Sequence, residues 1–422
     1  MNLKLLKITA LCALSLLASC TADRYFDMDG SKEGSPTPST KNTERVSSYH
    51  RNVLIYVSGG KNNLAGYLRD DLADLENGPL PSNFPEDHAV AVLYRNAYNS
   101  SAPAAPVLFR LYKDRNGNPV RDTFKVWSGT TPIFGNGTLT EAMNIIKEKL
   151  PAAGYGMVLS SHGSGYVPEG YYSDPDSYDG TGGSTTWGKV TPMSVGQDVD
   201  GSVSVEMELR ELRDAIPYHL DYILFDACLM GGVETAFELR EKADIIGFSQ
   251  TEILAEGFDY QTIAGRLLKK EPDPVQVCAD YFEQYREHED PKMRSATISA
   301  IKTSELGKLA EVCKVLFEKY RDQISTVNYS SVQRYYRFGR HYYYDMKDIL
   351  DKSGVSEEDM AGFNAALEKC VLYEAHTDQF LSSINLSNCC GLSMYLPSHG
   401  SAFLSKFYKE NLDWNDATEL VK

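Results

Sequence analysis

The stretch Asp221–Arg240, DYILFDACLMGGVETAFELR, constrains the fold of this chain more than any other segment. Its apolar run Tyr222–Phe225 is typical of a short strand buried on both faces, as in a parallel sheet. Two glycines then lead into apolar residues at helical spacing. Cys228 therefore lies where a strand ends and a helix is about to begin, which is where open α/β sheets bind their ligands.

A second apolar run, Gly156–Ser161, predicts another buried strand, and it ends in His162-Gly163. The segment that follows is rich in Gly, Ser and Tyr, and a helix is then predicted from Val205 to Ile216, with Ser204 as its N-cap. Strand, crossover and strand form a right-handed βαβ unit. If the two strands are neighbours, His162 and Cys228 emerge at the same edge of the sheet.

Further strand and turn patterns support an α/β fold for the first half of the chain. Val53–Val57 is an unbroken apolar run, as expected of a central parallel strand. Asn116-Gly117 lies between two β-rich runs and predicts a hairpin. The sequence therefore predicts a mostly parallel sheet flanked by helices in residues 50–260.

Residues 261–422 are predicted to form a mainly helical C-terminal subdomain, because apolar side chains recur there at helical spacing. Additional strands are expected at Arg294–Ile301 and Gly391–Leu396. The tyrosine-rich segment Tyr335–Tyr344 is expected to pack between subdomains, with a substrate groove as the alternative.

The N-terminus has the features of an export signal. Two lysines precede the apolar run Ile8–Ala18, which is too short to cross a membrane. Leu17-Ala-Ser-Cys20 resembles the lipobox of bacterial lipoproteins, so residues 1–20 are expected to be a signal peptide and Cys20 the lipidated residue. Polar residues 21–49 predict a flexible tether. The expected location is the bacterial cell envelope, anchored by lipid to the outer membrane, where surface exposure is one option.

Composition narrows the range of partners. The net charge is −16, and no cluster of Lys and Arg is dense enough for a nucleic-acid surface. We expect no nucleic acid, contact with the membrane only through the lipid anchor, and a monomer acting on peptides or proteins. Keeping Cys228 free leaves an odd number of cysteines in the mature chain, which argues against a full disulfide framework.

A cysteine and a histidine at adjacent strand ends indicate thiol chemistry. The thiolate is the nucleophile, and its ordinary pKa of about 8.5 leaves little of it ionised at neutral pH, so a nearby imidazole is needed. His162 could also deliver a proton to the leaving amine. The backbone N–H groups of Gly163 and Cys228 are candidates for holding the oxyanion.

At these residues the chain resembles the clostripain family of cysteine peptidases, which has the caspase-like fold also found in caspases, gingipains and legumains. The resemblance depends on the strand before His162-Gly163, on Asp226–Leu239 and on Ser249–Tyr260, and it continues to the C-terminal region. It implies a caspase-like sheet, a catalytic pair at His162 and Cys228, and hydrolysis of peptide bonds through an acyl-thioester.

The same resemblance implies cleavage after Arg or Lys, with acidic side chains binding the P1 residue. Asp226 matches one such acid, although a structural Asp that accepts hydrogen bonds from loop amides is the alternative. Glu252, Glu256 and Asp259 are the candidates for a second acid. A carboxylate that binds a guanidinium in a bidentate fork would explain a preference for Arg.

Family members are often zymogens that cut themselves between the catalytic His and Cys. Lys189 lies in that loop and is the candidate cleavage site, while an uncut lid is the alternative. Clostripain is also linked to calcium, and this loop contains several acids, but they lack the spacing of an EF-hand loop. No metal and no cofactor are therefore predicted.

Two alternatives to a cysteine endopeptidase remain. One is a different thiol enzyme, such as a glutaminase or amidase, although Asp226-Ala-Cys-Leu-Met does not fit the Gly-x-Cys-x-Gly elbow common in those enzymes. The other is a catalytically silent, surface-binding lipoprotein that retains the peptidase fold, because a fold does not determine a function.

Overall fold

The computed structural model describes residues 50–60, 62–84, 87–95, 104–135, 137–172, 174–180, 195–200, 203–338, 340 and 342–422. The predicted signal peptide with Cys20, the tether 21–49 and Lys189 lie outside these residues. In the part that is described, no helix is both long and apolar enough to cross a bilayer.

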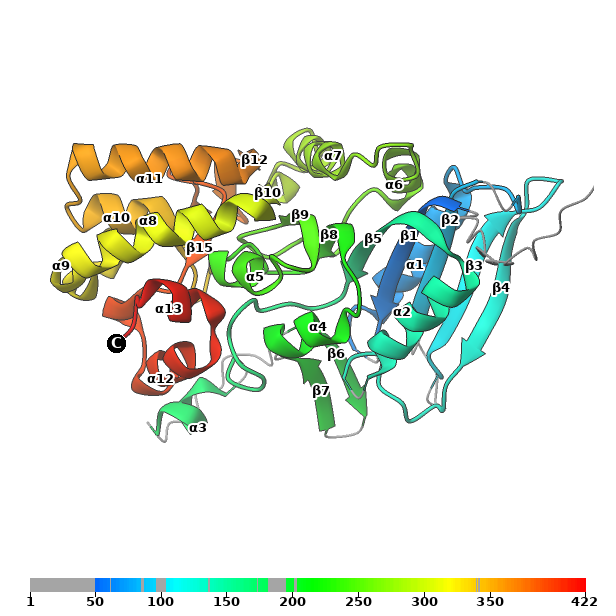
Figure 1. Ribbon diagram of the computed structural model, residues 1–422, viewed down its shortest axis with the longest axis horizontal. Helices are drawn as coiled ribbons and strands as arrows, with labels where there is room; N and C mark the ends of the chain where they lie inside the picture. Colours follow the sequence, from blue (N-terminus) through cyan, green and yellow to red (C-terminus); the bar gives the residue numbers. More distant parts are fainter. Residues whose placement is uncertain are drawn as a thin grey trace, which may run out of the picture. The chain divides into compact units, whose positions relative to one another are not determined.

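Nine strands of the described chain form one central sheet (Figure 1). Five neighbouring strands are parallel, and the two at either side of these five join by antiparallel pairing. In spatial order they are β12 (Val371–His376), β10 (Thr297–Lys302), β9 (Ala243–Phe248), β8 (Leu220–Asp226), β5 (Ala152–Ser160), β1 (His50–Gly59), β2 (Ala89–Arg95), β3 (Val107–Lys113) and β4 (Pro119–Val126). The prediction of an α/β fold with a mostly parallel core is confirmed.

The hairpin predicted at Asn116-Gly117 is also confirmed. Strands β3 and β4 pair on either side of it, and Gly117 has φ +83°. Glycine adopts this left-handed conformation without steric cost, so the turn can close tightly.

Helices cover both faces of the sheet, because alternate residues of each strand point to opposite sides. Val53, Ile55 and Val57 of β1 join one core, whereas Leu54 and Tyr56 join the other. The first core includes helices α2 (Thr138–Lys149), α4 (Leu209–Ala215), α5 (Val233–Glu238), α8 (Leu306–Lys319), α11 (Glu357–Cys370) and α13 (Asp413–Thr418). The second includes α1 (Ala65–Asn77), α6 (Tyr260–Leu267) and α7 (Pro274–Arg286).

Shorter elements complete the described structure. The remaining helices are α3 (Pro175–Asp179), α9 (Arg321–Thr326), α10 (Met346–Lys352) and α12 (Ala402–Asn411), with 3₁₀ turns at Pro291–Met293, Thr303–Glu305, Tyr329–Ser331 and Pro397–His399. Three strand pairs lie outside the main sheet: β6 (Val195–Asp200) with β7 (Val203–Met207), β11 (Tyr344–Asp345) with β15 (Ser393–Met394), and β13 (Gln379–Phe380) with β14 (Ile384–Asn385).

Two sequence predictions about individual elements were wrong. The helix expected over Val205–Ile216 starts only at Leu209, because the residues before it form β7, and Glu208 rather than Ser204 is the N-cap. Val203 and Val205 are β-branched residues that favour the pairing with β6. The strand expected over Gly391–Leu396 is only the short β15, which pairs with β11 and not with the main sheet.

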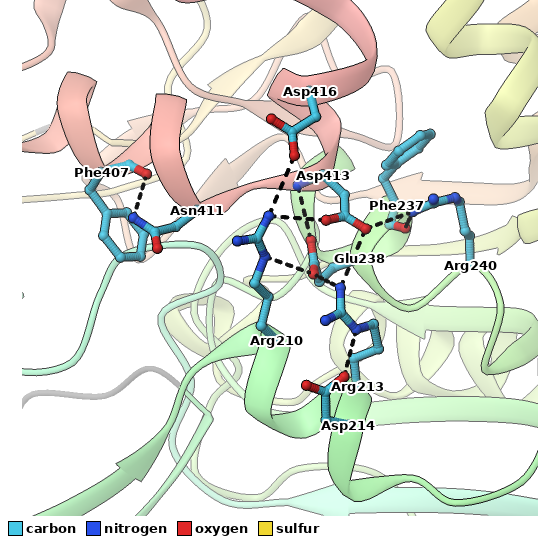
Figure 2. A network of polar contacts seen from close by, with 10 residues as sticks. All are labelled: Arg210, Arg213, Asp214, Phe237, Glu238, Arg240, Phe407, Asn411, Asp413 and Asp416. Carbon is cyan, nitrogen blue, oxygen red and sulfur yellow. Dashed lines mark hydrogen bonds and ion pairs between the residues drawn. The ribbon is translucent and has the colours of Figure 1, made fainter.

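Strands from both sides of residue 260 share the central sheet, and the described residues from 50 to 422 belong to one compact unit. The division into residues 50–260 and 261–422 stays a prediction about folding units. The C-terminal helix α13 is tied to α4 and α5 by a network of ion pairs (Figure 2). At its centre, Arg213 donates to the fully buried Glu238 at 2.5 Å, and Asp413 contacts Arg210, Arg213 and Arg240.

Candidate active site

His162 and Cys228 follow neighbouring strands at equivalent positions. Strands β5 and β8 are paired in parallel, with Ser160 opposite Asp226, and each of the two residues lies two positions beyond this pair. Both line a single cavity of about 100 Å³. The structure therefore brings the imidazole and the thiol to the same hollow at the carboxyl edge of the sheet.

Four segments line this hollow, which we call the active-site cavity: helix α1 with the residue before it, the ends of β5 and β8, and the loop after β9. The lining residues are Leu64, Tyr67, Leu68, Asp71, Ser160, Ser161, His162, Asp226, Ala227, Cys228, Ile253, Leu254, Ala255 and Gly257.

A strained turn follows the candidate nucleophile. Leu229 has φ +60°, the left-handed conformation that costs a non-glycine residue about 1–2 kcal/mol. Its N–H donates to the Thr251 carbonyl at 2.8 Å, which helps to hold the turn in place. Strain of this kind is concentrated at functional sites, and here it reverses the chain directly after Cys228.

The thiol of Cys228 is held by the loop after β9. The Ile253 N–H donates to Sγ at 3.4 Å, and the thiol donates to the Ile253 carbonyl at 3.7 Å. Burial raises the pKa of Cys228 to about 12, and the nearby Glu252 carboxylate adds to this rise. In this conformation Cys228 is a neutral thiol at pH 7.

The imidazole of His162 is oriented by Asn63, a residue that the sequence analysis did not select. Nε2–H of His162 donates to Oδ1 of Asn63 at 2.6 Å, which leaves Nδ1 as the basic nitrogen. Burial lowers the pKa of His162 to about 4, so the ring is neutral at pH 7. No hydrogen bond joins His162 to Cys228 in this conformation.

Glycine is required at position 163 by close packing of the two strand ends. A Cβ there would lie 2.7 Å from the Cys228 carbonyl oxygen and 2.9 Å from Sδ of Met230. The sequence analysis predicted N–H groups of Gly163 and Cys228 as oxyanion donors. Neither N–H donates to a group in the described part of the chain.

Asp226 is the one predicted substrate-binding acid that lines the active-site cavity. It is 6% exposed and accepts hydrogen bonds from the Tyr260 hydroxyl at 2.8 Å and the Ser160 hydroxyl at 3.2 Å. Burial raises its pKa to about 6, although these hydrogen bonds act in the opposite direction. The carboxylate is thus both anchored to the fold and placed at the cavity.

The other three predicted acids lie outside the active-site cavity. Glu252 pairs with Arg337 through both carboxylate oxygens, at 2.8 and 3.0 Å. Glu256 lies 3.5 Å from His288. Asp259 caps α6 and accepts from the Thr262 hydroxyl at 2.8 Å.

Asp71 is a cavity residue that the sequence analysis missed. It lies on the buried face of α1, between Leu68 and Leu75 at helical spacing, and is 8% exposed. An acid within an apolar helical stripe was the available signal, because Asp is almost never fully buried unless it is paired.

The tyrosine-rich segment packs against the loop that carries His162. The Tyr343 hydroxyl donates to the Ser164 carbonyl, and the Tyr166 hydroxyl donates to the Tyr342 carbonyl at 2.5 Å. Tyr342 and Tyr343 are both buried. These contacts support the loop from behind, which agrees with the predicted packing role.

The acids considered for calcium mostly have other partners. Asp198 pairs with Arg95, and Asp176 and Asp179 pair with Arg340. Elsewhere in the described chain, Glu374, His376 and Cys389 place potential metal-ligand atoms within 4.8 Å of one another. The carboxylate of Glu374 and Nδ1 of His376 are already bonded to each other at 2.7 Å.

Comparisons with known proteins identify similar sequences and structures. The sequence profile of the clostripain family matches residues 55–420. An inactive zymogen C11 protease from Parabacteroides distasonis is similar at 30% identity with a TM-score of 0.70, over 87% of this chain and 97% of that chain. A secreted C11 cysteine protease from Bacteroides thetaiotaomicron, in complex with an irreversible peptide inhibitor, has the same fold at 23% identity and a TM-score of 0.70, over 87% and 99% of the two chains. No curated protein matches the sequence.

Proposed function

This chain belongs to the clostripain family of C11 cysteine proteases, and from that premise we propose that it is an endopeptidase whose catalytic pair is His162 and Cys228. The observation that supports this pair is that both residues line one cavity at the ends of adjacent parallel strands. Asn63 holds Nε2–H of His162, so that Nδ1 is left to receive the thiol proton.

In the proposed reaction Nδ1 of His162 takes the proton of Cys228 while Sγ bonds to the substrate carbonyl carbon. The oxyanion that forms is held by the N–H groups of Gly163 and Cys228. His162 then gives the proton to the leaving amine as the C–N bond breaks, which leaves an acyl-thioester. A water molecule that loses its proton to His162 releases the acid product and restores the thiol.

The neutral thiol and neutral imidazole suit a resting state. The thiol of Cys228 makes hydrogen bonds with the backbone of Ile253 and not with His162, so its side chain must rotate toward His162 before it can react. We propose that cleavage after Lys189, in the segment between the two catalytic residues, accompanies this change. We also propose that the protein is an exported monomer anchored to the outer membrane through lipidated Cys20.

Peptides with a basic side chain at P1 are the proposed substrates, because Asp226 places a carboxylate at the active-site cavity. The test compares purified protein with Cys228→Ala and His162→Ala on fluorogenic peptides that differ only at P1. Turnover of Arg or Lys peptides by the parent alone is expected. Equal turnover by Cys228→Ala would remove the thiol from the mechanism, and no turnover by a parent that has been cut after Lys189 would favour the catalytically silent alternative.

The proposed self-cleavage after Lys189 is tested separately from peptide turnover. N-terminal sequencing of fragments formed during incubation should identify the bond after Lys189, and Lys189→Ala should prevent that cut. An uncut parent that is fully active would contradict the proposal.

A further inference from the structure

Asp71 is a buried carboxylate without a partner. It is 8% exposed, lines the active-site cavity and forms no hydrogen bond or ion pair with any residue that the structure describes. Burying an unpaired charge is costly, so buried carboxylates are normally paired. Without a cation the Asp71 carboxyl group avoids this cost by keeping its proton, and a cation that enters the cavity from outside the chain can take the place of that proton.

The electrostatic environment of Asp71 supports this reading. Burial and, to a smaller extent, the charges of Asp226, Asp74 and Asp70 together raise the pKa of Asp71 to about 9, with no basic side chain of the described chain acting against them. Asp226 is stabilised by the hydroxyls of Tyr260 and Ser160, whereas Asp71 has no such donors. The cavity thus holds two carboxylates, of which only one has donors from the protein.

Strand β1 places further buried polar groups near these acids, behind the residues that line the cavity. The buried hydroxyl of Tyr56 lies near those of Ser58 and Tyr260, and the Tyr56 and Ser58 hydroxyls make no hydrogen bond of ordinary geometry in the described structure. The pKa of Tyr56 is raised by burial and then by the charge of Asp71, which shows that the two groups are near each other.

We propose that Asp71 and Asp226 together bind the guanidinium group of a P1 arginine, so that Asp71 is a specificity-determining residue of this enzyme. This inference rests on the proposed function. A guanidinium presents five N–H donors in a rigid planar fork, which suits two carboxylates that come from different elements, α1 and β8. The apolar side chains of Leu64, Leu68 and Leu254 line the same cavity and can pack against the aliphatic stem.

Asp71→Asn tests this assignment, with Asp70→Asn as the matched control. Asp70 is the preceding residue of the same helix, but its side chain is exposed and pairs with Arg69. The substrates are peptides that differ only in Arg, Lys or citrulline at P1. We expect Asp71→Asn to lower kcat/KM for Arg by about 10- to 100-fold, mainly through KM, as for the loss of a charged hydrogen-bonding partner. The citrulline peptide should change less than twofold, and Asp70→Asn should behave as the parent.

A stability measurement distinguishes a binding role from a structural one. The raised pKa of Asp71 means that at pH 8 the folded protein must keep a proton that the unfolded chain has lost, which costs stability. Asp71→Asn removes this cost, so its thermal midpoint at pH 8 should be higher than that of the parent. A lower midpoint, together with equal losses for the Arg and citrulline peptides, would show that Asp71 is a structural residue. An Arg kcat/KM within twofold of the parent would also overturn the proposal.

Binding can be measured without catalysis. In the Cys228→Ala background, isothermal titration with a peptide that ends in arginine should give a dissociation constant about 10- to 100-fold weaker after Asp71→Asn. The corresponding citrulline peptide should bind both proteins equally. If this difference is found but the parent does not hydrolyse peptides, the proposed function fails and the assignment of Asp71 stands. If the parent hydrolyses Arg peptides and Asp71→Asn binds them equally well, only the assignment fails.

Discussion

Replacing Gly163 by alanine should impair catalysis by separating the two strand ends. The new Cβ would lie 2.7 Å from the Cys228 carbonyl oxygen, 2.9 Å from Met230 Sδ and 3.1 Å from Ala227 Cβ. Ordinary contacts of this kind begin at 3.4 Å, so the segments must separate by several tenths of an ångström. A misplacement approaching 1 Å costs about 10²-fold in rate, and overpacking of this kind costs about 1–3 kcal/mol of stability.

The assay measures kcat on the best P1 peptide and the free energy of unfolding in urea. Gly362→Ala is the control, because this glycine is exposed in α11 and a Cβ there has nothing within 4 Å. It should leave kcat unchanged and raise stability by about 0.5–1 kcal/mol, as alanine does in helices. If Gly163→Ala retains kcat within twofold, close packing of the two strand ends does not position the catalytic groups.

Three further predictions concern positioning, pH and the C-terminal network. Asn63→Ala should lower kcat about 10-fold with little change in KM, because His162 loses its orienting acceptor; a matching loss of thermal stability would indicate a structural role instead. Burial raises the pKa of Glu234 to about 7, so the free energy of unfolding should fall as pH rises from about 4.5 through 7. Glu234→Gln should flatten this pH dependence when the free energy is measured by urea unfolding, and an unchanged slope would contradict the prediction. Arg213→Met should lower the free energy of unfolding by about 3 kcal/mol, since it leaves buried Glu238 without this cation. Arg69→Met is the control and should cost less than about 1 kcal/mol, because the partner of Arg69 is exposed. Equal losses of stability would show that burial is not the cause.

Local patterns predicted much of the fold. Runs such as Val53–Val57 and Tyr222–Phe225 are apolar without interruption, and only a strand covered on both faces can bury every residue of such a run. The turn at Gly117 was also predicted correctly from its local sequence. Because parallel strands present their carboxyl ends at one edge, the position of His162 and Cys228 at that edge followed from the strand assignments.

Spacing along the chain could not show which partner a segment would find. Val203–Met207 forms a strand and not the predicted helix, because β6, which directly precedes it in the chain, pairs with it, and this pairing outweighed the helical spacing. The acids after β9 could not be ranked from spacing alone, because their roles depend on Arg337 and His288, which pair with Glu252 and Glu256.

The sequence by itself determined the α/β class, the positions of the main strands along the chain and the family, because these depend on local hydrophobic periodicity and on a long contiguous motif around Cys228. Only the tertiary structure decided which groups meet. It placed Asn63 against His162 and brought Asp71 of α1 to the cavity of Asp226. Such contacts depend on how a helix is rotated and seated against the sheet, and this is set by packing of the whole core rather than by any local pattern.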